Sequence, residues 1–220
     1  DDYFLTSELI RNIPSSGFTL NWCFSYKEAL EQMVAKRHDL YFIDYLLGGK
    51  TGLELLKEAI AAGVEEPIIL LTGKGNQKVD IEAMQVGAMD YLVKGELTVE
   101  KLERSIRYAL ERGATMKALR VNERKYRSMF ERSKDMVFIA DQACHFRDVN
   151  SATSDLLGYS REELMQLSVY NLFTQKKDLD RFRTLFINTR QVNDLEVEMK
   201  TRNSETKICI ISASLETDNN

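Results

Sequence analysis

The stretch Leu40-Tyr41-Phe42-Ile43-Asp44 is an apolar run that ends in a single carboxylate. Two similar runs follow it, of which residues 67–71 lead to Thr72 and residues 91–93 lead to Lys94. Short uninterrupted apolar runs are typical of strands buried on both faces of a parallel sheet. The carboxyl ends of such strands lie at one edge of the sheet, where open α/β sheets bind ligands. We therefore expect Asp44, Thr72 and Lys94 to share one site.

Segments with helical spacing of apolar residues alternate with these runs. Helices are expected over residues 5–13, 26–36, 52–62 and 79–86, and a further strand over residues 18–24. Ser25 and Thr51 are suited to cap two of the helices, and Gly63 is suited to end one. The alternation predicts βαβ units with a mainly parallel sheet, and such a sheet requires one more strand, which we expect to precede Asp1.

Composition and charge narrow the class of protein. The 220 residues are 44% hydrophobic and 29% charged, with a net charge of -4, which is ordinary for globular chains of one or two domains. Neither nucleic acid nor a membrane is an expected partner, because there is no basic excess and no apolar run approaches about 20 residues. Cys23, Cys144 and Cys209 are odd in number and far apart, which favours a reducing compartment, and we expect a cytoplasmic protein.

A set of spaced residues resembles the receiver domain of two-component response regulators over residues 1–113. The set consists of Asp1, Asp2, Asp44, Gly52, Thr72, Tyr91 and Lys94. The resemblance implies an α/β domain with a flavodoxin-like, doubly wound, five-stranded parallel sheet, whose first strand is absent from residues 1–220. Gly48 and Gly95 depart from the pattern, because the family usually has proline at both positions.

The resemblance also implies a phosphoryl-transfer site with magnesium. Asp44 would be the phosphoacceptor, modified by a cognate histidine kinase. Asp2 and Asp44 would bind Mg²⁺ directly, the backbone carbonyl of Leu46 would complete the protein's ligands, and Asp1 would act through water. Magnesium and a fixed ammonium are needed because like charges oppose the approach of a carboxylate to a phosphoryl group.

Three further residues are assigned to the same chemistry by the resemblance. Lys94 would pair with the phosphoryl oxygens. Thr72 would hydrogen-bond the attached phosphoryl group and pull its loop inward, and Tyr91 would fill the space that is vacated. We expect loss of Lys94 to affect the response to phosphorylation more than phosphorylation itself.

A long helix is predicted over residues 98–133, where no proline occurs. Leu102, Ile106, Ala109 and Met116 follow part of a coiled-coil repeat, with Gly113 at one seam position. Two interpretations stay open. The segment is either the last receiver helix, packed on its own sheet and followed by a linker, or a signalling helix that forms a homodimer.

The remaining residues resemble a PAS domain over residues 121–220. The resemblance rests on a set of residues with characteristic spacing: Tyr126, Phe130, Val149, Asn150, residues 156–160 and residues 162–164. It implies an α+β domain with an antiparallel sheet and short helices, whose last strand is absent from residues 1–220. Ser160 is suited to cap a helix with Glu163 at its third position.

The PAS ligand is unknown, and we expect none. Cys144, which stands where the family usually has a glycine, and His145 are expected to be exposed residues of the first hairpin. His145 lies on a predicted strand rather than on the helix that usually carries a haem ligand, and no flavin-reactive cysteine motif is present.

Phosphorylation-dependent signal transduction is the favoured function, with the receiver relaying its state through the helix to the PAS domain in a phosphorelay. No separate catalytic domain is recognised in residues 1–220, so the expected reactions are self-phosphorylation from a donor and slow dephosphorylation. Two alternatives are the regulatory part of a larger enzyme, such as a hybrid histidine kinase or a cyclic-dinucleotide synthase, and a scaffold that works without phosphorylation.

Overall fold

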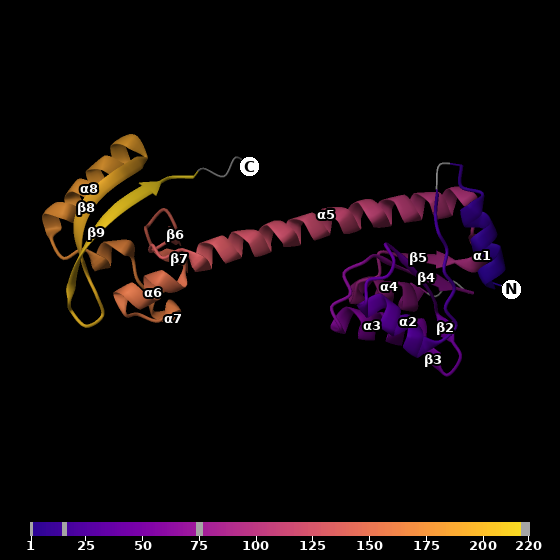
Figure 1. The fold of residues 1–220 in the computed structure, drawn as a ribbon. Helices are drawn as coiled ribbons and strands as arrows, with labels where there is room; N and C mark the ends of the chain where they lie inside the picture. The colour runs from indigo at the N-terminus through magenta and orange to yellow at the C-terminus, as the bar shows by residue number, and fades with distance from the viewer. Residues whose placement is uncertain (1, 15–16, 74–76, 217–220) are drawn as a thin grey trace. The chain divides into compact units, whose positions relative to one another are not determined.

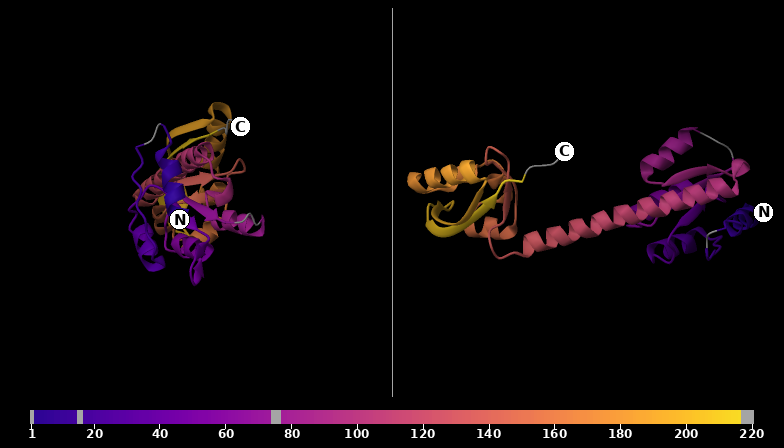
Figure 2. Two further views of the ribbon diagram at one scale, coloured as in Figure 1. Left: turned by 90° about the vertical axis from the view of Figure 1, so that its right-hand side faces the viewer. Right: turned by 90° about the horizontal axis from the view of Figure 1, so that it is seen from above.

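The structure is a computed structural model that describes residues 2–14, 17–73 and 77–216, without the side chains of Asp2 and residues 77–79. The chain divides into two compact units, with the boundary between Asn122 and Glu123. Figures 1 and 2 show the ribbon from three sides. Asp1, one of the residues expected at the magnesium site, lies outside the described residues.

A parallel sheet forms the centre of the first unit. Its strands are β1 (Tyr41–Asp44), β4 (Ile68–Thr72) and β5 (Asp90–Val93), in the order β1-β4-β5 (Figure 1). In this register Asp44 lies opposite Leu71, and Thr72 lies opposite Val93. All five residues of β4 are buried, as expected for the middle strand of a sheet covered on both faces.

Helices cover the two faces of this sheet. One face packs on α2 (Tyr26–Val34), α3 (Gly52–Ala61) and α4 (Gln77–Val86), through a core that includes Met33, Leu56 and Ala83. The other face packs on α1 (Asp2–Arg11) and the first half of α5 (Val99–Arg132), around Ile10 and Leu102. The predicted doubly wound α/β arrangement is therefore confirmed for the described residues.

Local capping signals work as predicted. The Ser25 side chain accepts a hydrogen bond from the backbone N–H of Glu28, and Thr51 forms a complete capping box with Glu54 at the start of α3. Gly63 has a φ of +84° directly after α3, in the left-handed region that glycine adopts without strain.

Two predicted strands differ from the structure. Residues 18–24 belong to no strand, and among the described residues this segment makes no backbone hydrogen bond. This segment and β1 both line a cavity. The run 40–47 is also interrupted: after β1 the chain forms a short antiparallel hairpin from β2 (Leu46–Leu47) and β3 (Lys50–Thr51), turning at Gly48 with a φ of +69°.

The second unit contains two antiparallel strand pairs. The first is β6 (Phe138–Ala140) with β7 (Phe146–Val149), and the second is β8 (Gln191–Lys200) with β9 (Thr206–Ser214). Between the pairs lie α6 (Ser151–Leu157), α7 (Arg161–Leu164), the 3-10 helix η2 (Val169–Leu172) and α8 (Lys176–Thr189). The predicted capping box of Ser160 with Glu163 is present, and the α+β class is confirmed.

The prediction that Cys144 is an exposed hairpin residue is wrong. Cys144 is buried in the core of the second unit, with a φ of +61°. Its carbonyl accepts hydrogen bonds from the Ser168 hydroxyl and the Val169 N–H, which draws this turn inward. His145 is exposed, as predicted.

The first half of α5 packs on its own sheet. Leu102, Ile106 and Ala109 are buried in the first unit, and a Cβ added at Gly113 would lie 3.2 Å from the Pro67 ring. Most of the proposed seam is therefore used within the receiver fold. Only Met116 of that seam is exposed to a substantial degree.

Candidate functional site at the carboxyl ends of the strands

The three side chains predicted to share a site stand at the carboxyl ends of neighbouring strands. Asp44 ends β1, Thr72 ends β4, and Lys94 directly follows β5 as the first residue of the 3-10 helix η1 (Lys94–Glu96). The register places each strand end beside the next, because Asp44 pairs with Leu71 and Thr72 with Val93. The parallel sheet thus brings together residues far apart in the sequence.

Asp44 and Lys94 form a close ion pair. The Lys94 Nζ atom lies 2.6 Å from the Asp44 Oδ2 atom. The Lys94 side chain is 16% exposed and the Asp44 side chain 32% exposed, so the ammonium is mostly covered while the carboxylate reaches solvent. The absence of a proline after Lys94 does not prevent its ammonium from reaching the carboxylate.

The second carboxylate oxygen is also positioned by the backbone. Asp44 Oδ1 accepts a hydrogen bond from the Leu46 N–H at 3.2 Å. One oxygen therefore meets a cation and the other a peptide dipole. The carboxylate is therefore held at the carboxyl edge of the sheet, where it is partly exposed and an incoming group can approach it.

Gly52 allows the chain to turn tightly behind this carboxylate. Its N–H donates to the Tyr45 carbonyl at 2.8 Å, and a Cβ at this position would lie 2.1 Å from the Asp44 carbonyl oxygen. No side chain fits in that space. The spacing between Asp44 and Gly52 is visible in the sequence, whereas the close contact that requires glycine is visible only in the structure.

Thr72 and Tyr91 lie in the adjacent strands. The Thr72 side chain is buried at the end of β4. Tyr91 is half-buried in β5, opposite Leu70, and packs against the core that α2, α3 and α4 form with the sheet. Thr72 is the last residue of β4, and Tyr91 pairs with Leu70 of the same strand. A movement of the end of β4 would therefore affect both side chains.

The magnesium ligands are described only in part. The Asp44 carboxylate and the Leu46 backbone carbonyl are oxygen donors of the kind that Mg²⁺ prefers, and Mg²⁺ often binds through one or two carboxylates with waters completing its shell. The Asp1 residue and the Asp2 side chain, which would supply the other carboxylates, lie outside the described residues. Within the described part of the chain no group of three acidic, histidine or cysteine side chains is arranged to hold a metal.

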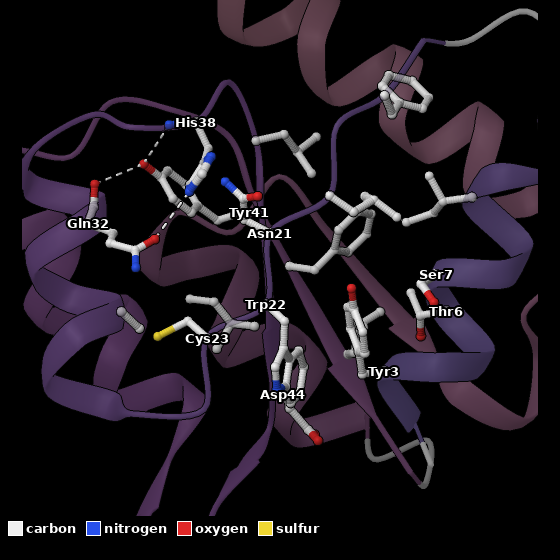
Figure 3. A pocket seen from close by; sticks show the side chains of 18 of the residues that line it. Tyr3, Thr6, Ser7, Asn21, Trp22, Cys23, Gln32, His38, Tyr41 and Asp44 are labelled. Carbon is white, nitrogen blue, oxygen red and sulfur yellow. Dashed lines mark hydrogen bonds between the residues drawn. The ribbon is translucent and has the colours of Figure 1, made fainter.

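Sequence reasoning did not foresee the cavity beside β1. It is lined by residues of α1, of the segment 18–23 and of β1, among them Asp44 (Figure 3). Lys94 also lines it.

A buried polar network supports the start of the second unit. The Asn150 side chain, 1% exposed, accepts from the N–H groups of Val137 and Thr153, and donates to the carbonyl of Asp135. It caps α6 and at the same time fastens the segment before β6. This role is structural, and it accounts for the asparagine that follows Val149.

Family comparison agrees with this geometry. The family profile of the response regulator receiver domain matches residues 1–107, and the profile of the PAS fold matches residues 124–220. The chain is a receiver domain followed by a PAS domain. This combination fits two-component signal transduction, because receiver domains bind Mg²⁺ and are phosphorylated by histidine kinases.

The receiver domain is similar to curated response regulators. It is 32% identical to the two-component response regulator PhoP of Pseudomonas aeruginosa over 114 residues, which are 52% of this chain and 50% of PhoP. It is also 32% identical to the transcriptional regulatory protein DltR of Streptococcus agalactiae over 82 residues, 37% of each chain. The chain thus spans half or less of the length of these relatives.

Solved structures of both domain types resemble the chain. The signal receiver domain of a LuxO repressor protein from Vibrio parahaemolyticus covers 54% of this chain and 92% of its own, with 18% identity and a TM-score of 0.49. A PAS domain from a two-component sensor histidine kinase covers 46% of this chain and 88% of its own, with 16% identity and a TM-score of 0.39.

Among the described helices of the receiver and PAS domains, none is both long and apolar enough to cross a membrane.

Proposed function

We propose that Asp44 accepts a phosphoryl group from a cognate histidine kinase, and that the receiver relays this state through α5 to the PAS domain. The observation that carries the proposal is the 2.6 Å pair between Lys94 Nζ and Asp44 Oδ2 at the carboxyl edge of the sheet. A carboxylate in this position is exposed enough to react and is partly neutralised, which reduces its repulsion of a phosphoryl donor.

The transfer forms one bond and breaks another. An Asp44 oxygen attacks phosphorus while the bond from phosphorus to the donor's leaving atom breaks, and the leaving group takes the electron pair of that bond. Lys94 pairs with the oxygens of the transferred group. Asp2, Asp44 and the Leu46 carbonyl would hold Mg²⁺ directly, with Asp1 acting through water, and the ion would offset the negative charge that gathers there.

Thr72 and Tyr91 would convert the new charge into movement. The Thr72 hydroxyl donates to a phosphoryl oxygen, which draws the end of β4 toward Asp44. Tyr91, which is only half-buried, then has space to turn inward. The register of β4 and β5 supports this step, because Thr72 pairs directly with Val93, the residue before Lys94.

Helix α5 is the proposed route from the receiver to the PAS domain. Its first half is buried against the receiver sheet through Leu102 and Ile106. Near its other end Phe130 is buried in the second unit, and the Glu131 carboxylate accepts a hydrogen bond from the Ser151 N–H at 3.0 Å. A helix fastened by side chains at both ends can carry a displacement along its length.

Residues 1–220 are proposed to be a regulatory module, with a phosphorylated receiver as its input. Homodimerisation through the exposed part of α5 or through the PAS domain belongs to the same proposal.

Intact-mass measurement after incubation with a small phosphodonor and magnesium tests the phosphorylation step. We expect the chain to gain one phosphoryl group, Asp44→Asn to gain none, and Asp39→Asn, which changes an exposed carboxylate before the start of β1, to react like the unmodified chain. Failure of the folded, unmodified chain to gain the group would contradict the proposal and favour a scaffold that works without phosphorylation.

A further inference from the structure

The hairpin of β2 and β3 directly follows the segment that carries Asp44, and it consists of two residue pairs within residues 46–51 (Figure 1). Its turn is formed by Gly48 and Gly49, and a Cβ added at either glycine would meet nothing within 4 Å. Leu46, at the start of the hairpin, is 71% exposed. Isolated two-stranded hairpins are marginally stable in water, and glycine has the greatest backbone freedom. The hairpin therefore depends on contacts with other parts of the receiver.

Lys50 connects this hairpin to two helices. Its Nζ atom lies 4.2 Å from the ring centroid of Tyr26, the first residue of α2. The same atom lies 3.1 Å from the Oε1 atom of Glu58, which belongs to α3. Tyr26 packs against the core between these helices and the sheet, so the ammonium meets a ring that is itself held in place. A cation–π contact and an ion pair thus fasten one strand of the hairpin to the body of the receiver.

The position of the hairpin determines which backbone groups meet the Asp44 carboxylate. The Leu46 N–H, in the first strand of the hairpin, donates a hydrogen bond to Asp44 Oδ1 at 3.2 Å. The carbonyl of the same residue is one of the proposed magnesium ligands. Leu46 pairs across the hairpin with Thr51, the neighbour of Lys50. A displacement of the hairpin would therefore change the orientation of the carboxylate and move an oxygen donor beside it.

We propose that Lys50 is a positioning residue for the phosphorylation of Asp44. By binding Tyr26 and Glu58, Lys50 fixes the hairpin, and the hairpin in turn fixes the N–H and carbonyl of Leu46 beside the carboxylate. The inference rests on the proposed function and adds to it a residue that acts through the backbone of Leu46. This role differs from that of Lys94, whose ammonium contacts the carboxylate directly.

A second role for a lysine near the site would be to attract an anionic phosphodonor by its charge. The two roles predict different effects of Glu58→Gln, which removes a partner of Lys50 and leaves the ammonium charged. Attraction predicts a lower donor concentration for the half-maximal rate, because the positive charge is less neutralised. Positioning predicts a lower maximal rate, because the hairpin loses one of its contacts.

Phosphorylation rates, measured by intact mass over a range of donor concentrations at constant magnesium, distinguish these roles. Lys50→Met and Glu58→Gln should each lower the maximal rate by about fivefold, with the half-saturating donor concentration unchanged. Lys50→Arg should retain the rate, because a guanidinium makes both kinds of contact. The variant with both Lys50→Met and Glu58→Gln should react no more slowly than Lys50→Met alone, since the two changes remove a shared contact.

Lys57→Met is the matched control. Lys57 pairs with Glu82 at 2.8 Å, and the two side chains are 50% and 44% exposed, compared with 49% and 45% for Lys50 and Glu58. This pair joins α3 to α4 rather than to the hairpin. Lys57→Met should therefore leave the maximal rate unchanged. Circular dichroism of each variant establishes that the receiver is folded.

Amide hydrogen exchange at Leu46 provides a measurement without a phosphodonor. Exchange should be about fivefold faster in Lys50→Met and Glu58→Gln, because the hydrogen bond to Asp44 is then made less often, and unchanged in Lys57→Met.

Unchanged exchange at Leu46 in the folded Lys50 and Glu58 variants would overturn the inference. An unchanged maximal rate in these variants, or a lower half-saturating donor concentration in Glu58→Gln, would overturn it as well. If the unmodified chain gains no phosphoryl group while exchange at Leu46 responds as expected, the positioning contact is supported and the proposed function is contradicted.

Discussion

Gly52 lies so close to Asp44 that a Cβ on Gly52 would stand 2.1 Å from the Asp44 carbonyl oxygen. The second obstacle is the Ile43 side chain, whose Cγ2 atom would be 2.8 Å away. The first residue of α3 is thus packed against the backbone of Asp44, the proposed phosphoacceptor. The position of the Asp44 carboxylate depends on a residue that carries no chemistry of its own.

Gly52→Ala should destabilise the receiver by about 1–3 kcal/mol, because the obstructing atom belongs to the backbone and cannot rotate away. It should also slow phosphorylation by displacing Asp44. Gly49→Ala is the matched control, since a Cβ at Gly49 meets nothing within 4 Å. Urea unfolding and intact-mass phosphorylation rates provide the two measurements. Equal stability of the two variants would contradict this account of Gly52.

Lys94→Ala should lower the phosphorylation rate by about tenfold or less, because a partly exposed ion pair contributes roughly 1 kcal/mol. The conformational response should be lost, since no ammonium then holds the phosphoryl oxygens. Hydrogen exchange in β4 and β5, measured with and without phosphodonor, reports the response. Lys101→Ala removes an exposed lysine paired with Glu96 and should leave both properties unchanged. Equal loss of rate and response in Lys94→Ala would refute this division of roles.

Asn150→Ala should destabilise the PAS domain by about 2–4 kcal/mol. The substitution removes the cap of α6 and leaves the half-buried N–H of Val137 without its side-chain acceptor. Asn203→Ala, in the exposed turn before β9, should change stability by less than about 0.5 kcal/mol. Thermal unfolding, monitored by circular dichroism, distinguishes the two variants. A small effect at Asn150 would show that the network reorganises without cost.

The capping box of α3 predicts a pH dependence. Hydrogen bonds from the Thr51 backbone and hydroxyl lower the pKa of Glu54. A carboxyl whose folded pKa is depressed contributes stability above its unfolded pKa, and this contribution is lost as pH falls through the folded value. Glu54→Gln should therefore cost stability at neutral pH, and the difference from the unmodified chain should vanish in acid. A difference that is constant with pH, measured by urea unfolding, would contradict the assignment.

The two interpretations of α5 predict different effects of two leucine substitutions. Leu102 is fully buried in the receiver, so Leu102→Ala should cost about 2–5 kcal/mol of receiver stability. Leu119 is 68% exposed, so Leu119→Ala should cost almost nothing in a monomer. If α5 pairs with a second copy, Leu119→Ala should instead weaken the dimer, which light scattering measures over a range of concentrations.

Much of the architecture could be predicted from short-range patterns. The apolar runs before Asp44, Thr72 and Lys94 predicted parallel strands with a common edge, and the structure has them. Ser25 and Thr51 were recognisable as caps, since a cap bonds to backbone within three residues of itself. Such signals depend on neighbours in the sequence and can be interpreted without a fold.

The sequence by itself determined the fold class, the caps and the order of site residues, because periodicity and capping are local properties. Only the tertiary structure decided that residues 18–24 form no strand within the described chain, that Cys144 is buried and that Lys94 reaches Asp44. Each of these depends on a segment distant in the chain. A strand forms only when another backbone lies beside it, a turn residue is buried only when other elements cover it, and an ion pair forms only when the sheet register aligns both side chains.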